Sequence, residues 1–377
     1  MTTPAAGRPT FAVIDATAVR GNFALLRAAV SPTVAVLAVV KADAYGHGAA
    51  MVAPILEAAG ADWLGVATVD EGVELRAAGV RKPILVLTGA AAADVPALVE
   101  QRLSVAVLHR EMARDLADGL QGQRLRVHIK VDTGMGRIGV LPSELPGLLD
   151  ELHAAAGFDV EGVFSHFANA DSVEREYSDY QLKVFRQAVD LVAAAGYRPR
   201  WLHIANSAAA MSRPDCHFSL VRPGIALYGV APSAHGALAG LRPAMRLETR
   251  IVQLKAVPSE FPVSYGQTFV TRRPSLIAVL PIGYADGYSR ALSNRAHVLI
   301  RGQRAPVVGA VCMDLTMVDV TDVKGVRLGD EVVLWGRQQA AEIRVTEVAE
   351  WQRTVSYEVL TRVGKRVPRV LQDDGRR

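Results

Sequence analysis

Apolar runs of strand length alternate with amphipathic segments over the first two-thirds of the chain. The amphipathic segments repeat apolar residues at i, i+3 and i+4 and often end in Gly, which is typical of helices packed on a core. We expect strands within residues 34–41, 63–68, 83–89, 126–134, 160–168, 200–211 and 218–229, and helices at 49–60, 69–79, 93–102, 143–157 and 178–196. About eight such units over roughly 220 residues predict an α/β fold with an N-terminal (β/α)8 TIM-type barrel.

The pattern changes near residue 240. Strand-like runs separated by Gly, Pro, Asn and Asp then follow one another, at residues 245–257, 275–288, 296–311, 315–321 and 330–336. Such runs predict a C-terminal, mainly-β domain. We therefore expect a barrel domain at 1–240 and a β-rich domain at 241–377. The first apolar run, residues 11–15, could belong to either domain.

Composition narrows the class of protein. The chain has 377 residues, half of them hydrophobic, which is enough for two domains with large cores. Cys216 and Cys312 are too few for a disulfide framework, and the start, MTTPAAGRPT, lacks the apolar segment of a signal peptide. We therefore expect a cytoplasmic protein, and no apolar run approaches the ~20 residues of a membrane span. The net charge of +4 is not concentrated in a basic cluster, so neither nucleic acid nor a membrane is an expected partner.

One buried strand ends in a charge. Residues 34–40 are all apolar, which is typical of a strand covered on both faces, yet Lys41 follows directly. A lone lysine at a strand end commonly extends to water. Here, however, the other strand ends also carry polar or ionisable side chains: Lys130, Asp132, Arg137, His166, His203, Asn206, Ser207 and Arg222. The strand ends of a barrel meet at its functional face, so this collection favours a site.

The chemistry of these residues favours a particular cofactor. Partial burial and neighbouring cations should lower the pKa of Lys41, which makes it a nucleophile suited to a Schiff base. Backbone N–H groups around Ser207, and around Gly224 and Ile225 in RPGIALYG, can approach an anion closely. A lysine for an aldehyde together with a cradle for a phosphate predicts pyridoxal 5'-phosphate as cofactor.

The order of motifs resembles one known family. AVVKADAYGHGA, VHIKVDTGMGRIG, HFANAD, HIANSAA, VRPGIALYG, VSYGQTF, PIGYADGY, VCMD and SYEVL…RVPR resemble the motifs of alanine racemases, in that order and at similar spacings. The resemblance extends from about residue 10 to about residue 370. It implies a pyridoxal-phosphate-dependent isomerase that interconverts L- and D-alanine and supplies D-alanine for the peptidoglycan of the bacterial cell wall.

The resemblance implies a cofactor site. Lys41 would be the Schiff-base lysine, and Arg222 would face the pyridine nitrogen. Arginine cannot accept a proton, so the ring should stay neutral, which limits side reactions. The other residues implied to hold the cofactor are Tyr45, Arg137, His166, His203, Ser207, Gly224, Ile225 and Tyr357, with the phosphate at Tyr45, Ser207, Gly224, Ile225 and Tyr357. No metal site is expected.

The resemblance also implies how catalysis would proceed. Lys41 and Tyr265 would be bases on opposite faces of the substrate Cα, with His166 bridging Tyr265 and Arg222. Arg137 and the backbone of Met313 would receive the substrate carboxylate. Supporting positions are Lys130, often carbamylated in the family, which would orient Arg137; Cys312 and Asp314 beside Met313; Tyr284; and Asp171 and Arg290 in an outer substrate corridor. Tyr265 and Tyr284 would reach into the site of a second subunit, which implies a homodimer with composite sites.

Some alternatives stay open. The family usually has an arginine where this chain has Ala310, which puts the electrostatics of the corridor in question. A racemase that also accepts serine is hard to exclude, because a hydrophobic pocket rejects an added hydroxyl only weakly. A barrel-type pyridoxal-phosphate decarboxylase would need an acidic partner for the ring nitrogen, where Arg222 stands. A pyridoxal-phosphate homeostasis protein without turnover would resemble the barrel alone, against which residues 240–377 and Tyr265 argue.

Overall fold

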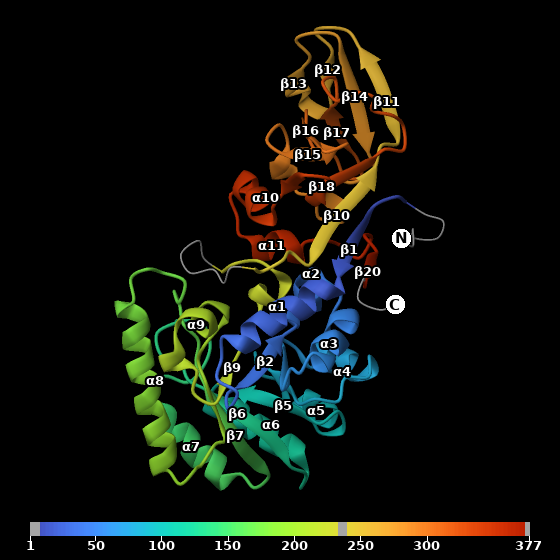
Figure 1. The fold of residues 1–377 in the computed structure, drawn as a ribbon. Helices are drawn as coiled ribbons and strands as arrows, with labels where there is room; N and C mark the ends of the chain where they lie inside the picture. Colours follow the sequence, from blue (N-terminus) through green and yellow to red (C-terminus); the bar gives the residue numbers. More distant parts are fainter. Residues whose placement is uncertain (1–7, 233–239, 374–377) are drawn as a thin grey trace. The chain divides into compact units, whose positions relative to one another are not determined.

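A computed structural model describes residues 8–232 and 240–373 (Figure 1). The chain divides into two compact units. The barrel unit consists of Ala18–Ala44 and Ala49–Arg242. The β-rich unit consists of Met1–Thr17, Tyr45–Gly48 and Pro243–Arg377.

The barrel unit is built on eight parallel strands in the order β8-β7-β6-β5-β4-β3-β2-β9. The strands are β2 (Ala35–Val39), β3 (Trp63–Val66), β4 (Ile84–Val86), β5 (Leu103–Val107), β6 (Leu125–Lys130), β7 (Phe158–Phe164), β8 (Trp201–His203) and β9 (Leu220–Val221). The two ends of this order nearly close the barrel, because the Ser219 N–H donates to the Leu202 carbonyl at 3.2 Å and the Arg222 N–H to the Ala205 carbonyl at 2.9 Å. The predicted barrel is confirmed.

Helices lie around the outside of these strands (Figure 1). Every residue of β3, β4 and β5 is buried, which explains why all their residues except Ser104 are apolar or glycine. The helices are α1 (Ala16–Ala28), α3 (Ala49–Ala58), α4 (Val69–Ala77), α5 (Val95–Glu100), α6 (Arg110–Leu120), α7 (Leu145–Ala154), α8 (Glu176–Ala194) and α9 (Ser207–Ser212), with short 3₁₀ turns η1 (Ala92–Asp94), η2 (Pro214–Cys216) and η3 (Ile225–Tyr228). Each of the five predicted helices is present, whereas the unit of β5 and α6 was missing from the prediction.

The β-rich unit contains three sheets. A seven-stranded sheet has the order β16-β15-β18-β10-β1-β20, with β19 paired to β18; a second has the order β11-β14-β17; and β12 pairs with β13. The elements are β1 (Phe11–Asp15), β10 (Met245–Arg250), β11 (Gln253–Val257), β12 (Pro262–Val263), β13 (Phe269–Val270), β14 (Ser275–Leu280), β15 (His297–Ile300), β16 (Gln303–Pro306), β17 (Thr316–Asp319), β18 (Glu331–Gln338), β19 (Ala341–Ile343), β20 (Arg369–Gln372), α10 (Val345–Gln352) and α11 (Ser356–Thr361), with 3₁₀ turns η4 (Tyr265–Gln267), η5 (Tyr284–Asp286) and η6 (Arg290–Leu292). The predicted mainly-β domain is confirmed.

The first apolar run joins the β-rich unit. Strand β1 pairs antiparallel with β10 and parallel with β20, with Ala12 opposite Leu247 and Arg369. The sequence left the membership of this run open, because an isolated apolar strand carries no sign of its partner. The limits 1–240 and 241–377 stay a proposal for the domain organisation.

Candidate active site

Five ionisable side chains lie at or just beyond the carboxyl ends of barrel strands. Lys41 follows β2, Lys130 ends β6, His166 follows β7, His203 ends β8 and Arg222 follows β9. Strand β2 pairs in parallel with β9, so Lys41 and Arg222 leave neighbouring strands. Parallel strands deliver such residues to one face of the barrel, where barrel enzymes have their sites.

A left-handed helical turn begins at Lys41. This is α2 (Lys41–Gly46), in which φ is 53° at each of Ala42, Asp43, Ala44 and Tyr45 and 80° at Gly46. The Ala44 N–H donates to the Val40 carbonyl at 2.8 Å. Residues with a Cβ rarely adopt this conformation, and runs of them are rarer still. A strained backbone next to the candidate nucleophile is typical of a functional site.

Glu71 supports this turn from the next strand–helix unit. Its Oε1 accepts the Ala42 N–H at 2.7 Å, and its Oε2 accepts the Ala67 N–H at 2.6 Å. The pKa of Lys41 is lowered by burial and by the positive charges of Arg137 and Arg222, against the opposing charge of Glu71. The neutral amine is the nucleophilic form. The sequence analysis missed Glu71, although its position three residues after Thr68 marks the capping box of α4.

Arg222 is a buried cation, only 5% exposed. Its Nη1 donates to His203 Nδ1 at 2.9 Å, and its Nη2 donates to the Ser165 carbonyl at 2.6 Å and to His166 Nδ1 at 3.2 Å. Burial and Arg222 itself lower the pKa of His203 and His166 well below the usual value, so both rings are neutral. Burial and Arg137 in turn lower the pKa of Arg222 to about 9. The hydrogen-bond partners of the guanidinium are therefore uncharged.

Asp132 shapes the loop that carries Arg137, and Lys130 is buried at the end of β6. Asp132 Oδ1 accepts N–H groups of residues 134, 135 and 136, and Oδ2 accepts the Arg137 N–H at 3.1 Å. Burial of Asp132 opposes its charged form, but these four donors outweigh burial and lower its pKa. Lys130 is 2% exposed, and its Nζ lies 5.2 Å from the centre of the Phe164 ring. Burial and Arg222 lower the pKa of Lys130 to about 7.

Two of the predicted phosphate residues of the barrel unit, Ser207 and Gly224, are joined by a hydrogen bond. Ser207 Oγ accepts the Gly224 N–H at 2.8 Å and the Ala226 N–H at 3.4 Å. Helix α9 begins at Ser207 and the turn η3 begins at Ile225, so the hydroxyl holds the starts of these two segments together. In the β-rich unit, the predicted phosphate residues Tyr45 and Tyr357 have ring centres 6.0 Å apart.

Four other predicted residues of the β-rich unit, Tyr284, Cys312, Met313 and Asp314, lie on two connected segments. Asp286, with its side chain fully buried, accepts two hydrogen bonds from Arg8 at 2.6 and 2.7 Å and lies 3.3 Å from Arg366. The Tyr284 N–H donates to the carbonyl of residue 312 at 3.0 Å, and that of residue 285 to Met313 at 3.0 Å. These contacts fix the Tyr284 turn against the segment that contains Cys312, Met313 and Asp314. No motif in the sequence marks Arg8 as the partner of Asp286.

Tyr265 is 73% exposed at the start of η4 in this single chain. The preceding Ser264 donates from Oγ to the Ala310 carbonyl at 2.7 Å and lies 3.4 Å from Cys312 Sγ. This contact uses the backbone of Ala310, so the missing arginine side chain does not disturb it. Arg290 is exposed on η6, and Cys312 is partly exposed.

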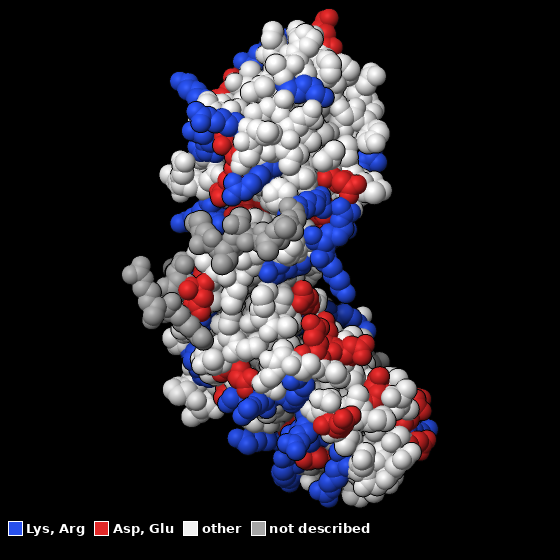
Figure 2. Space-filling view, turned by 90° about the vertical axis from the view of Figure 1, so that its right-hand side faces the viewer, with Lys and Arg blue, Asp and Glu red and all other residues white. Residues whose placement is uncertain are grey.

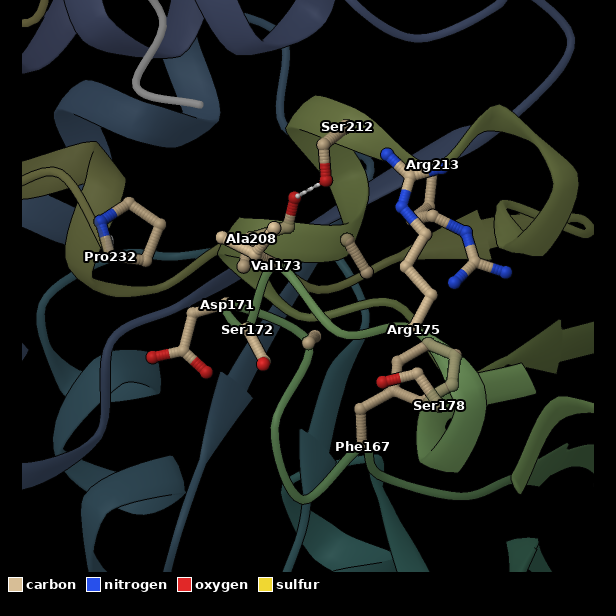
Figure 3. Close-up of a pocket in the computed structure, with 12 residues that line it drawn as sticks. Phe167, Asp171, Ser172, Val173, Arg175, Ser178, Ala208, Ser212, Arg213 and Pro232 are labelled. Carbon is tan, nitrogen blue, oxygen red and sulfur yellow. Dashed lines mark hydrogen bonds between the residues drawn. The ribbon is translucent and has the colours of Figure 1, made fainter. Parts of the chain in front are cut away.

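A pocket of about 180 Å³ lies between the loop after β7 and helix α9 (Figure 3). Asp171 and Ser172 line it from the loop, and Ser212 and Arg213 line it from the end of α9. Arg213 is held by Asp179 and Asp215, at 2.6 and 2.7 Å. Asp171, which was predicted for the substrate corridor, therefore lines this pocket. Lys41 and Arg222 are not among the residues that line it.

The fold and the strand-end residues define a (β/α)8-barrel enzyme with a β-rich second domain. Family models for the alanine racemase N-terminal and C-terminal domains match residues 14–232 and 244–371. The chain belongs to the alanine racemase family. It is therefore an isomerase.

Relatives match over nearly their whole length. The alanine racemase of Symbiobacterium thermophilum is 48% identical over 96% of this chain and 97% of its own, and that of Geobacter sulfurreducens is 46% identical over 96% and 97%. Among solved structures, the alanine racemase of Bacillus anthracis with bound L-Ala-P is 38% identical with a TM-score of 0.94, covering 98% of this chain and 97% of that one. The alanine racemase of Streptomyces lavendulae is 37% identical with a TM-score of 0.93, covering 97% and 98%.

Proposed function

We propose that the protein interconverts L- and D-alanine with pyridoxal 5'-phosphate, and that it supplies D-alanine for peptidoglycan. The observation that carries the proposal is the pairing of β2 with β9, which brings together a lysine with a lowered pKa and a buried guanidinium with uncharged partners. Family membership supports the same reaction and does not favour a decarboxylase.

The residues present fit this cofactor. Lys41 suits an aldehyde, the closeness of Ser207 to Gly224 supports a phosphate site there, and Arg222 would meet the ring nitrogen. The cofactor, when bound, would delocalise the charge that remains after a proton leaves the substrate Cα. Arg222 has no acceptor, so it would leave the ring nitrogen unprotonated and keep that delocalisation modest.

Two groups would move the proton. Lys41 Nζ would act on one face of Cα and Tyr265 Oη on the other, because inversion requires removal from one face and delivery to the opposite one. Arg137 and the backbone of Met313 would hold the substrate carboxylate, with Lys130 orienting Arg137. The half-buried His166, which accepts from Arg222, would donate from its other nitrogen toward Tyr265.

A homodimer with composite sites is part of the proposal. Tyr265 is largely exposed in the single chain, and the family resemblance implies that it serves the site of a second subunit. Lys41→Ala and Tyr265→Ala homodimers should each be nearly inactive. A mixed dimer would hold one doubly defective site and one intact site, so an equal mixture should recover about a quarter of wild-type activity. No recovery, once subunit exchange is shown, would contradict shared sites.

The described surface supports a small-molecule partner. On the face shown in Figure 2, Lys and Arg side chains are interspersed with Asp and Glu rather than forming a continuous basic surface. Among residues 8–232 and 240–373, no helix is long and apolar enough to cross a membrane. We retain a cytoplasmic location in the proposal, since the chain has only two cysteines.

Purified protein should be incubated with pyridoxal phosphate and, separately, L-alanine, D-alanine and L-serine, and the products separated on a chiral column. We expect alanine to reach equal amounts of both enantiomers from either side, and serine to react more slowly. Lys41→Ala should abolish the reaction, whereas Lys183→Ala, an exposed lysine on α8, should not. Release of carbon dioxide without D-alanine would show a decarboxylase instead.

A further inference from the structure

A chain of buried polar side chains runs from Arg222 into the interior of the barrel. His203 Nδ1 accepts from Arg222 at 2.9 Å, and His203 Nε2 lies 2.9 Å from His128 Nδ1. His128 Nε2 lies 3.4 Å from Glu161 Oε1, which also accepts a hydrogen bond from Ser104. Both histidines are completely buried, and the Glu161 side chain is 16% exposed. Glu161, His128 and His203 lie on β7, β6 and β8, Arg222 follows β9, and the neighbouring Ser104 lies on β5.

The chemistry of the two ends fixes the direction of every proton in this chain. A guanidinium only donates, so His203 must present a lone pair at Nδ1 and carry its proton on Nε2. That proton is donated to His128 Nδ1, so His128 must carry its own proton on Nε2. An ionised carboxylate only accepts, and Glu161 faces that proton. Burial lowers the pKa of both histidines, in keeping with neutral rings.

Two features of the backbone are built around this arrangement. The pairing of β6 with β7 slips by one residue, from Val127 opposite Val160 to His128 opposite Gly162, so Glu161 is the extra residue of a β-bulge. Bulges redirect a side chain, and this one allows Glu161 to reach His128. A Cβ on Gly162 would lie 2.2 Å from His128 Nδ1, so only glycine leaves room for the imidazole.

Packing holds the rings in this orientation. The Phe164 ring stacks on His203 with centres 4.9 Å apart and planes within 4°. Trp63 meets His128 edge-on, with centres 5.5 Å apart. These contacts fix the planes of the two rings, and a 180° flip of either ring within its plane would break its hydrogen bonds to the neighbouring side chains.

We propose that Glu161 and His128 are positioning residues for Arg222. The hydrogen bond from His203 to His128 Nδ1, with the carboxylate of Glu161 3.4 Å from His128 Nε2, holds His203 in the Nε2–H tautomer, so that its Nδ1 accepts from the guanidinium. With the opposite tautomer, an N–H of His203 would face an N–H of Arg222 and displace the guanidinium. This inference rests on the proposed function in one respect: Arg222 faces the ring nitrogen of the cofactor.

The tautomers can be measured without the cofactor. In protein labelled with ¹⁵N-histidine and free of pyridoxal phosphate, the ring nitrogen shifts should show His203 and His128 protonated on Nε2, assigned with His203→Gln and His128→Gln. Glu161→Leu removes the acceptor and should shift His203 toward the Nδ1–H form. Glu161→Gln keeps an oxygen acceptor and should preserve the wild-type tautomer. Ser104→Ala is the matched control, because it removes a neighbour of Glu161 but no link of the chain.

In the enzyme with bound pyridoxal phosphate, the same variants should distinguish a positioning role of Glu161 from a purely structural one. We expect Glu161→Leu to lower kcat for alanine by about tenfold with little change in KM, the size of effect known for outer hydrogen-bond partners. Glu161→Gln should restore most of kcat. Wild-type His203 protonated on Nδ1 would overturn the inference even if Glu161→Leu fails to fold. A wild-type protein that shows the expected tautomers but does not racemise alanine would refute the proposed function while leaving the tautomer assignment intact.

Discussion

The left-handed turn after Lys41 can be tested by changing one residue to glycine. Ala42 is exposed, its φ is 53°, and its N–H donates to Glu71. Ala42→Gly keeps that hydrogen bond and removes only the Cβ that makes the left-handed conformation costly. Ala24 provides a matched control, since it is also exposed but lies in the middle of the right-handed helix α1.

The two variants should change the free energy of unfolding in opposite directions. A left-handed residue with a Cβ costs about 1–2 kcal/mol, so the four residues from Ala42 to Tyr45 together store about 4–8 kcal/mol. Glycine at position 42 removes the strain of one of these four residues. It also gives the unfolded chain more conformational freedom, which lowers the free energy of unfolding by roughly 0.5–1 kcal/mol. The net effect is a gain in the free energy of unfolding of about 0.5–1 kcal/mol. Ala24→Gly relieves no strain and should lose about 1 kcal/mol.

The assay is urea unfolding followed by far-ultraviolet circular dichroism, at one protein concentration and with saturating cofactor, because ligand and assembly both change apparent stability. The midpoint for Ala42→Gly should rise and that for Ala24→Gly should fall, with unchanged slopes. Ala42→Gly should also lose activity several-fold, because the backbone next to Lys41 becomes freer. Equal losses of stability in both variants would refute the strained turn.

Three further outcomes are expected. Borohydride reduction of the yellow holoenzyme should fix a pyridoxyl group on Lys41, and peptide mapping that places it on another lysine would reject that assignment. Arg222→Glu should protonate the ring nitrogen, move the cofactor absorption to longer wavelength with alanine and slow racemisation; unchanged spectra and turnover would place Arg222 elsewhere. Lys130, with a pKa of about 7 when folded and about 10.4 when unfolded, binds fewer protons in the folded state between these values, so the free energy of unfolding should rise by about 2 kcal/mol from pH 7 to pH 9. Urea titrations in carbon-dioxide-free buffer should show this rise in the wild type and lose it in Lys130→Met.

The barrel could be predicted because strands that are buried in a parallel sheet consist largely of apolar residues. Strand β5 was not predicted, although four of the five residues of Leu103–Val107 are apolar. The residues between α5 and β5, Gln101 and Arg102, include no Gly or Pro, so the helix and strand merge into one stretch of sequence. A turn-forming residue between the helix and the strand was missing, whereas the hydrophobic pattern was present. The following helix α6 was therefore not predicted either.

The contacts around the candidate site were less accessible to sequence reasoning. His128 is fully buried within β6. Its contact with His203 depends on the register of β6 against β7, and the bulge at Glu161 has no signature in a single sequence. The four N–H groups that converge on Asp132 likewise depend on the loop conformation, which the letters DTGMGR allow but do not require.

The neighbourhood of Lys41 and Arg222 shows why some of the site could nevertheless be anticipated. These residues are 181 positions apart and follow the first and last strands of the barrel sheet, β2 and β9. In an open sheet with strands in sequence order they would lie at opposite edges, but closure of a barrel makes its first and last strands adjacent. The register Val36 opposite Val221 shows that adjacency. A predicted barrel therefore already implies that a lysine after its first strand and an arginine after its last lie side by side, whatever the loops between them do.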